Sequence, residues 1–339
     1  MKKLMILSTG GTIACTQTSA GLIPTLSAGD ILSYLPDARA VGQIDAKTIF
    51  NLDSSNIQPE EWKMIAREVF ECIDEYDGVV ILHGTDTMAY TASMLSFMLR
   101  GLKKPVVITG SQLPIGHPQT DAKLNLGHAM LTALSGLCGV FVAFDGTIMR
   151  GCRVAKVRTT SQNAFESINC PPVGEIRDGA VRLFAEPEQP REEPVLDEAI
   201  DPGVFLLKLI PGTRTEVFQA IGDMGYHGVV IEGFGLGGIH CLRRNLLDGI
   251  KQLLGAGVAV LLTTQCRYEA SDPMVYETGR LAVESGILQG FDMTSECAVT
   301  KLMWALAHAD DLNGVRRIMM TDYCGEISLP EGAGEFCGE

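Results

Sequence analysis

Two short segments of the chain bring threonine hydroxyls next to bare glycine backbone. The first is TGGTIA at 9–14, in which Thr12 directly follows two glycines, and the second is HGTDT at 83–87, where Thr85 stands beside Asp86. A threonine hydroxyl is a weak nucleophile that needs a neighbouring group to take its proton. Glycine leaves room for a planar substrate group and lets backbone N–H groups point at a developing oxyanion. These residue types indicate acyl transfer at threonine, with a carboxylate available to bind an ammonium group.

Each threonine taken singly is better explained as a helix N-cap or a turn residue, and only two such loops at one sheet edge favour a site. Other chemistries have weaker support in the sequence. Phosphate-loop and serine-hydrolase motifs do not occur, and no Cys/His cluster suggests a structural metal. The segment GFGLGG at 233–238 matches G-x-G-x-x-G, but the next expected strand ends LLTTQC without an acidic residue to hold a ribose. We therefore interpret this segment as a glycine-rich turn.

The elements that must position the threonines follow from an alternation of apolar runs and amphipathic stretches. The expected N-terminal strands are KLMILSTGG, GVVILHGTD, PVVITGSQ and GVFVAFDG, and the expected helices are PEEWKMIAREVFECIDE, MAYTASMLSFMLRG and DAKLNLGHAMLTALSG. Beyond residue 203 the expected strands are VFLLKLIP, GVVIEGFG and VAVLLTTQC, and the helices are TEVFQAIGDMG, NLLDGIKQLLGAG and SECAVTKLMWALAHADD. Such Val/Ile/Leu-rich strands separated by helices are typical of a parallel sheet covered on both faces.

Ligands of open α/β sheets bind outside the carboxyl ends of the strands. TGGT, HGTDT and TGSQLP (109–114) each follow an expected strand. We therefore expect these three glycine-containing loops to meet at one edge of the sheet and to form the site there.

The length and composition predict two α/β domains in a chain of 339 residues. The larger is an N-terminal domain (1–190) with a mostly parallel sheet flanked by helices. A linker (191–203) lies within the Pro-rich, acidic segment 185–202, and a smaller flavodoxin-like or Rossmann-like domain (204–339) follows.

The net charge of −14 disfavours nucleic acid and anionic membranes as partners. The apolar run at the N-terminus is too short for a signal peptide, and the uncharged stretch 124–144 is expected to be a buried helix followed by a core strand. The ten scattered cysteines, Cys337 included, are expected to be reduced and mostly buried. These features favour a cytoplasmic protein.

The pair TGGTI and HGTDT resembles the two signature motifs of the asparaginase/glutaminase family, most closely the cytoplasmic type I L-asparaginases. The resemblance covers nearly the whole chain and includes LDSSN at 52–56, VITGSQLP at 107–114, GCRVAKVRT at 151–159 and GFDMTSECAVTKL at 290–302. It implies hydrolysis of L-asparagine to L-aspartate and ammonia, without metal or cofactor, by a homodimer or homotetramer.

The resemblance also implies roles for particular residues. Thr12 matches the primary nucleophile, which forms a transient acyl-threonine ester. Thr85, Asp86 and Lys156 match a second catalytic cluster, in which a partly buried lysine takes the proton from Thr85. Backbone N–H groups at Thr12 and Thr85 would form the oxyanion hole. Without the family pattern, Lys156 is better explained as a solvated surface lysine.

The expected substrate-binding residues come from the same loops. Asp53, Ser54 and Ser55 match the segment that holds the α-carboxylate and α-amino groups, and Gly11 lies beside the nucleophile. Thr85 and Asp86 would complete the pocket, with Asp86 on the ammonium group. This set suits a zwitterionic amino acid, which needs donors at one end and a carboxylate at the other.

The sequence departs from the family pattern at a few positions. In the loop ACTQTSAGLIP, Leu22 stands where many relatives carry a tyrosine that bonds the nucleophile. We hypothesise that Tyr276 in PMVYETG replaces it, although an ordinary half-buried packing role explains this residue equally well. Ala155 stands where allosteric relatives carry a threonine, so cooperativity is not expected. Cys266, near that region in relatives, is expected to be a buried thiol.

Two other functions stay open. The first is a glutaminase or the amidase subunit of a tRNA-dependent amidotransferase, although that subunit should carry an extra domain before the first signature. The second is a non-catalytic amino-acid-binding protein, which would not need a second hydroxyl–lysine pair. The sequence does not decide between asparagine and glutamine, because one methylene changes selectivity by only ~1–3 kcal/mol.

Overall fold

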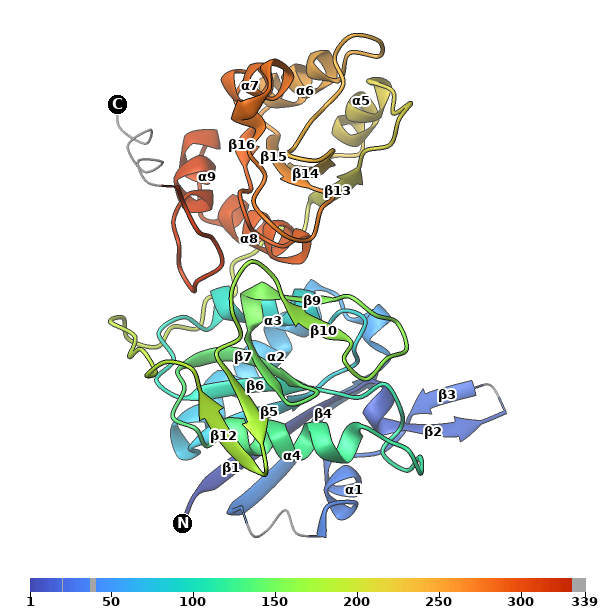
Figure 1. Cartoon of the computed structure of the whole chain (residues 1–339), viewed down its shortest axis with the longest axis vertical. Helices are drawn as coiled ribbons and strands as arrows, with labels where there is room; N and C mark the ends of the chain where they lie inside the picture. Colours follow the sequence, from blue (N-terminus) through green and yellow to red (C-terminus); the bar gives the residue numbers. More distant parts are fainter. Residues whose placement is uncertain (20, 37–40, 331–339) are drawn as a thin grey trace. The chain divides into compact units, whose positions relative to one another are not determined.

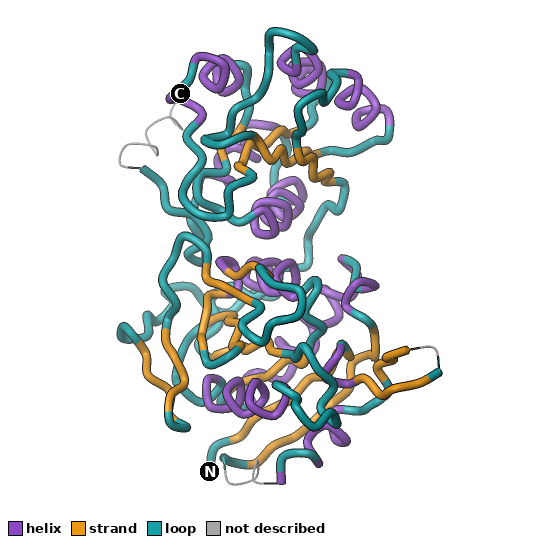
Figure 2. Tube along the Cα trace, turned by 45° about the vertical axis from the view of Figure 1, so that its right-hand side comes forward, coloured by secondary structure: helices purple, strands orange, loops and turns teal. Residues whose placement is uncertain are grey.

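The computed structural model describes residues 1–19, 21–36 and 41–330. The chain divides into two compact units, Met1–Glu198 and Ala199–Glu339, called unit 1 and unit 2. Each unit has its own sheet with helices around it (Figures 1 and 2). The predicted fold class, a larger and mostly parallel α/β unit and a smaller C-terminal one, is confirmed.

The unit 1 sheet has eight strands in the order β12-β11-β8-β7-β6-β5-β1-β4. Their bounds are β1 Lys3–Gly10, β4 Gln43–Leu52, β5 Gly78–Leu82, β6 Pro105–Thr109, β7 Gly139–Phe144, β8 Thr147–Arg150, β11 Gly174–Arg177 and β12 Ala180–Leu183. Five neighbouring strands, β7, β6, β5, β1 and β4, are parallel to one another. At the other end of the sheet, β8 pairs antiparallel with β7, β11 with β8, and β12 with β11. The central strands β5 and β6 are buried at every position, as their unbroken apolar sequences predict.

Helices cover both faces of this sheet (Figure 1). They are α1 Ala28–Ser33, α2 Pro59–Cys72, α3 Met88–Met98 and α4 Ala122–Thr132. Val80 and Leu82 of β5 pack in the same core cluster as Leu126 of α4. The alternate residues of β5 therefore point to the opposite face, which α2 and α3 cover. A capping box and a first-turn proline fix the start of α2.

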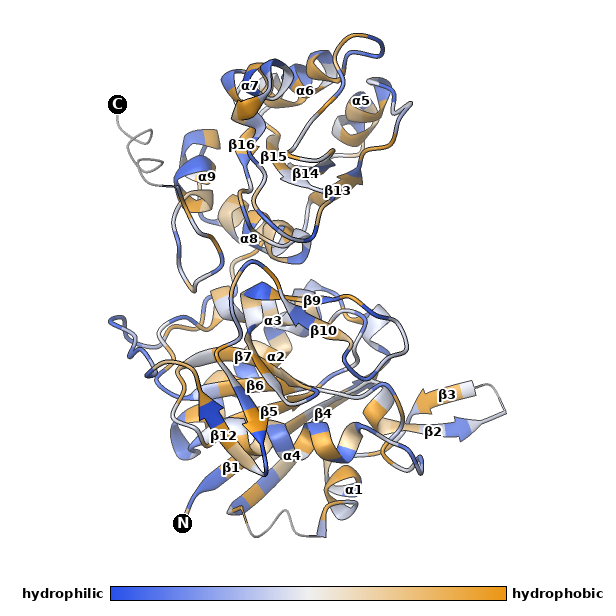
Figure 3. Ribbon diagram, in the orientation of Figure 1, coloured by the Kyte–Doolittle hydropathy of each residue, from blue (hydrophilic) through white to orange (hydrophobic). Residues whose placement is uncertain are grey.

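Two small hairpins lie outside the main sheet. β2 (Cys15–Thr18) pairs antiparallel with β3 (Gly21–Pro24), in residues that the sequence analysis treats as a loop. β3 is apolar although Leu22 and Ile23 are exposed, and Figure 3 shows its contrast with the more polar β2. β9 (Val154–Lys156) pairs with β10 (Phe165–Ser167) and carries Lys156 at its end.

Unit 2 is a four-stranded parallel sheet in the order β13-β14-β15-β16. Its elements are β13 Val204–Lys208, α5 Glu216–Asp223, β14 Gly228–Gly233, α6 Leu246–Gly255, β15 Ala259–Thr264, α7 Glu277–Glu284, β16 Leu288–Gln289, α8 Ser295–Ala307 and α9 Leu312–Met319. The strands follow one another in chain order, so this sheet has no strand-order reversal of the kind that makes a dinucleotide crevice. GFGLGG forms a turn closed by a bridge between Phe234 and Gly238, as predicted.

The segment between β12 and β13 has neither helix nor strand. Its first part follows unit 1, because the Val195 and Asp197 amides donate to backbone carbonyls of Arg100 and Met98. No helix among the described residues is long and apolar enough to cross a membrane. The stretch 124–144 contains most of α4 and then β7, which matches the expected helix and core strand.

The expectation that most cysteines are buried is wrong. Nine of them lie in the described residues and are free thiols, whereas Cys337 lies outside the described residues. The buried ones are Cys15, Cys152 and Cys297, so most are not buried. Cys266, expected to be buried, is exposed because it lies beyond the end of β15 in a surface loop.

Candidate active site

The three predicted loops and the DSSN segment lie at the same edge of the unit 1 sheet. Their strands β6, β5, β1 and β4 are consecutive neighbours in the sheet and are parallel. The carboxyl ends of these four strands therefore meet. The Thr9 hydroxyl ties two of the ends together by donating to the Leu82 carbonyl at 2.9 Å. The expectation that TGGT, HGTDT and TGSQLP share one edge is confirmed.

Gly11 and Gly84 are where the two threonine loops touch. A Cβ on Gly11 would lie 2.3 Å from the Gly84 nitrogen, and Gly11 also has a φ of +74°. A Cβ on Gly84 would lie 2.5 Å from the Ser54 hydroxyl. Side chains at these positions would push the loops apart, so both glycines are required by the close approach of backbones.

Thr12 opens a single 3₁₀ turn, Thr12–Ala14, directly after this contact. It is half-buried, and its hydroxyl has no hydrogen-bond partner among the described residues. The backbone N–H groups of Thr12 and Thr85 likewise donate to no described residue. Two unpaired donors and a free hydroxyl therefore belong to two loops that touch, which is the arrangement that acyl transfer needs.

Thr85, Lys156 and Asp86 form a hydrogen-bonded cluster. The Lys156 ammonium donates to the Thr85 hydroxyl at 2.8 Å and to Asp86 Oδ1 at 2.7 Å. Thr85 is buried, and the Lys156 side chain is 18% exposed. Asp86 is 62% exposed, and no described residue bonds its second oxygen. The structure thus brings together three residues that lie up to 71 positions apart, and Lys156 is not a solvated surface lysine.

Gln112 is a residue of this site to which the sequence analysis assigned no role. Its side-chain oxygen accepts the Thr85 hydroxyl at 3.4 Å, while its amide nitrogen donates to the carbonyls of Thr159 and Ser161. The Asp121 carboxylate fixes the backbone amide of Gln112. Gln112 therefore connects Thr85 to the segment that follows Lys156. The sequence signal for Gln112 was its position in the TGSQLP loop. Its role could not be assigned from that loop alone, because its amide nitrogen is held by the Thr159 carbonyl, 47 residues away.

The DSSN segment is attached to the HGTDT loop through Ser54. The buried Ser54 hydroxyl accepts the Asp86 amide at 3.2 Å, and its carbonyl accepts the Thr87 hydroxyl at 2.7 Å. Asp53 Oδ1 accepts both the amide and the hydroxyl of Ser55. Asp53 and Ser55 are exposed. Ser54 thus joins two loops, whereas its neighbours face outward.

His83 is a second residue that the sequence analysis quoted without a role. Its ring is fully buried, and burial lowers its pKa to about 4. Nδ1 lies 2.6 Å from the Gly84 carbonyl oxygen, and Nε2 lies 2.9 Å from the Thr91 hydroxyl, which also accepts the Trp62 indole N–H at 3.0 Å. The ring therefore lies directly beneath the HGTDT loop.

The remaining candidates lie elsewhere. Tyr276 belongs to unit 2, where it caps the start of α7 and is 61% exposed, so it is not the half-buried packing residue of the alternative interpretation. Leu22 lies exposed on β3, and Ala155 is buried in β9. Among the described residues, no group of three or more His, Cys, Asp or Glu side chains could hold a metal ion.

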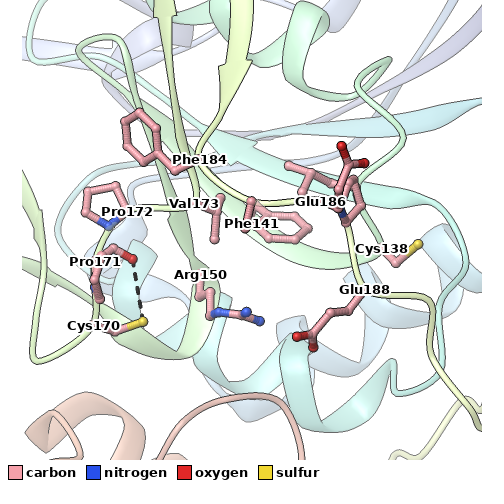
Figure 4. A pocket seen from close by; sticks show the side chains of 13 residues that line it. Cys138, Phe141, Arg150, Cys170, Pro171, Pro172, Val173, Phe184, Glu186 and Glu188 are labelled. Atoms are coloured by element: carbon pink, nitrogen blue, oxygen red, sulfur yellow. Dashed lines mark hydrogen bonds between the residues drawn. The ribbon is translucent and has the colours of Figure 1, made fainter.

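A cavity of about 370 Å³ lies elsewhere in unit 1, and none of the candidate site residues lines it. Figure 4 shows Phe184 and Pro172 on one side of it and Glu186 and Glu188 on the other, with Arg150 between them. The candidate site is instead an open sheet edge, where Asp53, Ser55 and Asp86 face solvent.

Comparisons with known proteins agree with this geometry. The family model for the asparaginase N-terminal domain matches residues 3–189, and the model for the glutaminase/asparaginase C-terminal domain matches residues 203–319. An L-asparaginase of Thermococcus kodakarensis is 46% identical over 96% of this chain and 99% of its own length. A glutamyl-tRNA(Gln) amidotransferase subunit of the same organism is 38% identical over 97% of this chain and 77% of its own length.

Solved structures give the same result. The thermostable L-asparaginase from Thermococcus kodakarensis superposes with a TM-score of 0.91 at 45% identity, over 97% of this chain and 100% of that one. L-asparaginase I from Vibrio cholerae has a TM-score of 0.86 at 30% identity, over 97% of this chain and 99% of that one. The chain therefore belongs to the asparaginase/glutaminase family of amidohydrolases.

Proposed function

We propose that this protein hydrolyses the side-chain amide of L-asparagine to L-aspartate and ammonia, with Thr12 as the nucleophile, as a step of asparagine catabolism. One observation carries the proposal. The Lys156 ammonium contacts the Thr85 hydroxyl and the Asp86 carboxylate at 2.8 and 2.7 Å, on a loop whose Gly84 touches Gly11 next to Thr12. An amide bound at this contact would meet both hydroxyls.

In the first half-reaction, Thr12 Oγ attacks the amide carbon and a C–O bond forms. The unpaired N–H groups of Thr12 and Thr85 stabilise the negative charge that develops on the carbonyl oxygen, which is usually the largest catalytic contribution. The Thr12 proton goes to the leaving nitrogen, the C–N bond breaks, and ammonia departs. The product is an acyl-threonine ester.

In the second half-reaction, water attacks the ester. Thr85 takes a proton from the water and passes its own proton to the Lys156 amine, which must first have lost a proton to solvent. The ester C–O bond breaks as the proton held by Lys156 returns through Thr85 to Thr12 Oγ, and L-aspartate leaves. Gln112, which accepts the Thr85 hydroxyl, keeps this hydroxyl oriented between turnovers.

The exposed polar groups at the same edge suit the α-carbon substituents of the substrate. The unpaired oxygen of Asp86 and the carboxylate of Asp53 bind the α-ammonium group. The Ser55 hydroxyl binds the α-carboxylate after turning away from Asp53 Oδ1, to which it donates in the absence of substrate. Ser54 acts through the loops, because its hydroxyl is already bonded to the Asp86 amide. Gly11 leaves room for the substrate amide.

Tyr276 is proposed as the residue that orients Thr12 in place of the missing loop tyrosine. Two observations support this role: no described residue bonds the Thr12 hydroxyl, and Tyr276 is 61% exposed with its own hydroxyl unbonded among the described residues. We expect Tyr276→Phe to lower kcat about 10-fold, because removing a group that orients a catalytic residue slows the chemical step by at least this factor. Turnover of this variant at the wild-type rate would exclude the role.

The protein acts as a homodimer or homotetramer. The support is a set of large apolar side chains that are exposed in the loops after the strands of unit 2, namely Ile210, Leu242, Tyr268, Met274 and Val275. Exposed apolar side chains mark an association surface where they form one contiguous patch. A cytoplasmic location is part of the same proposal, and a solved relative described as a probable cytoplasmic L-asparaginase from Campylobacter jejuni supports it. Light scattering on the purified protein measures the assembly.

The decisive experiment measures ammonia release from L-asparagine, L-glutamine and D-asparagine by the purified protein and by Thr12→Ala. We expect turnover of L-asparagine, and loss of about 10⁴-fold or more in kcat for the variant, because removing a nucleophile abolishes covalent catalysis. Thr16→Ala, in the adjacent hairpin, is the matched control and should keep wild-type kcat.

The assay also tests the alternatives. The 38% identity to an amidotransferase subunit makes glutamine the competing substrate, and a higher kcat/KM for L-glutamine would favour that function. Binding of L-asparagine without ammonia release would favour a non-catalytic amino-acid-binding protein. Equal activity of Thr12→Ala and wild type would refute the proposed nucleophile.

A further inference from the structure

The buried imidazole of His83 has one protonation pattern that fits its surroundings. The Gly84 carbonyl can only accept, so Nδ1, 2.6 Å away, must carry the proton. Burial keeps the ring neutral, and Nε2 is then an acceptor. The Thr91 hydroxyl therefore donates to Nε2, and it accepts the Trp62 indole N–H in turn.

All hydrogen bonds in this chain run in the same direction: Trp62 donates to Thr91, Thr91 donates to His83, and His83 donates to the Gly84 carbonyl. All three side chains are buried. In a low-dielectric interior, a fully satisfied network of this kind is rigid, because breaking any link leaves a buried polar group without a partner. The end of the chain is thus a fixed carbonyl oxygen directly before Thr85.

The fixed carbonyl determines where the next N–H points. In a planar trans peptide the C=O of Gly84 and the N–H of Thr85 point in opposite directions. Because His83 holds the carbonyl toward the interior, the Thr85 N–H is turned away from the interior. This N–H donates to no described residue, so it is an aligned and unused donor.

We propose that His83 is a positioning residue that locks the Gly84–Thr85 peptide plane and thereby aims the Thr85 N–H at the oxyanion of the transition state. This role rests on the proposed function, since it assumes that an oxyanion forms at Thr85. His83 itself touches neither substrate nor nucleophile. It acts through one backbone peptide.

Three substitutions separate this role from simple packing. His83→Asn keeps an amide N–H near the position of Nδ1, whereas His83→Gln carries its amide to the position of Nε2 and loses the bond to Gly84. The Gln variant should lose ~10–100-fold in kcat, the cost of a small misplacement in a catalytic site, and the Asn variant should recover most of that loss. His128→Gln is the matched control, because His128 is a histidine of unit 1 whose pKa is likewise lowered by burial, although it is only partly buried.

The kinetic signature is specific. A donor used only by the oxyanion changes kcat and leaves KM for L-asparagine nearly unchanged. The pH profile of kcat should keep its shape in the Gln variant, because the buried, neutral His83 ring exchanges no proton in the proposed reaction. Wild-type kcat in a folded His83→Gln protein, or equal losses in the Gln and Asn variants, would overturn the proposal.

Thr91→Val provides a second route if His83→Gln does not fold. This variant keeps the ring but removes the donor to Nε2, so the ring is free to change tautomer and release the Gly84 carbonyl. We expect a fall in kcat of ~10-fold without a change in KM, and wild-type kcat in a folded Thr91→Val protein would overturn the proposal. Absence of ammonia release by the wild-type protein would instead refute the proposed function, and with it the oxyanion at Thr85 on which this role depends.

Discussion

Units 1 and 2 each contain a close lysine–carboxylate pair, and the two pairs differ in every other respect. In unit 1, Lys156 and Asp86 are 2.7 Å apart, with side chains 18% and 62% exposed. In unit 2, Lys301 and Glu326 are 2.6 Å apart and both are 0% exposed. The first lysine also donates to a hydroxyl. The second donates to the backbone carbonyls of Met319 and Thr321 besides Glu326, and its ammonium lies 5.6 Å from the centre of the Tyr323 ring.

The two pairs differ in how much hydrogen-bonding capacity their members have left for other partners. Lys301 has three oxygen partners for its three protons, and Glu326 also accepts the amides of Tyr323 and Cys324. Burial raises the pKa of Glu326, but the Lys301 ammonium and the neighbouring donors outweigh it and hold this pKa below its ordinary value. This pair fixes the C-terminal segment to α8. The unit 1 pair retains an open carboxylate oxygen and solvent access, which its proposed role in proton transfer and substrate binding requires.

The largest expected effect is on activity and belongs to unit 1. Lys156→Met removes the proton acceptor of Thr85 and should lower kcat by about 10³-fold, within the usual range for general acid–base groups. Stability should change little, because a pair with an exposed partner contributes ~0–1 kcal/mol. Lys103→Met, which breaks the exposed pair with Glu193, is the control and should keep wild-type kcat. Steady-state ammonia release and thermal unfolding measure the two effects.

The next effect is on stability and belongs to unit 2. Lys301→Met leaves the Glu326 carboxylate buried without its cation and should lower the free energy of unfolding by about 3–5 kcal/mol. The double variant Lys301→Met/Glu326→Leu should recover much of this loss, because it removes both buried charges. Chemical denaturation of the three proteins checks this. An unchanged unfolding midpoint in the single variant would mean that the pair is not a structural anchor.

The smallest effect concerns Asp322, which lies beside the unit 2 pair. Burial and the adjacent Glu326 carboxyl raise the pKa of Asp322 to about 6. A carboxyl with a raised folded-state pKa contributes stability at low pH and loses it as the pH rises through about 6. Asp322→Asn should therefore stabilise the protein at pH 7. Solvent screening at this accessible side chain limits the gain to roughly 1 kcal/mol.

The pH dependence separates this effect from a packing change. Between pH 7 and pH 4 the stability difference between Asp322→Asn and wild type should shrink, because Asp322 becomes neutral in the folded wild-type protein. Thermal melts across this range measure the difference. A constant difference at all pH values would show that ionisation of Asp322 is not the cause.

The sequence predicted the elements whose patterns are strong and missed those that depend on neighbours. The buried strands β5 and β6 and the capped helix α2 have unambiguous apolar runs or end signals, and they form as expected. The edge strand β4 and the antiparallel strands β11 and β12 were not predicted, because they lack a continuous apolar run and are stabilised by pairing with the sheet. The β2–β3 hairpin was missed for the same reason.

The candidate site divides in the same way. Thr12, Thr85 and Asp86 could be named from short motifs, because glycine beside a hydroxyl is unusual at the end of a buried strand. Gln112 and His83 could not be assigned, since their partners, Thr159 and Ser161 for one and Trp62 and Thr91 for the other, come from other parts of the chain. The burial of Cys266 was predicted wrongly, because its short sequence context does not reveal that its loop faces solvent.

The amino-acid sequence by itself determined the class of fold, the edge of the sheet where polar loops gather, and the residue types that can act there, because strand periodicity and glycine positions are local properties. Only the tertiary structure decided which side chains meet. The 2.8 Å contact between Lys156 and Thr85, the contact of Gly11 with Gly84, and the buried chain from Trp62 to the Gly84 carbonyl all require segments far apart in sequence to pack together. Hydrogen-bond partners and burial are properties of that packing, so no local pattern contains them.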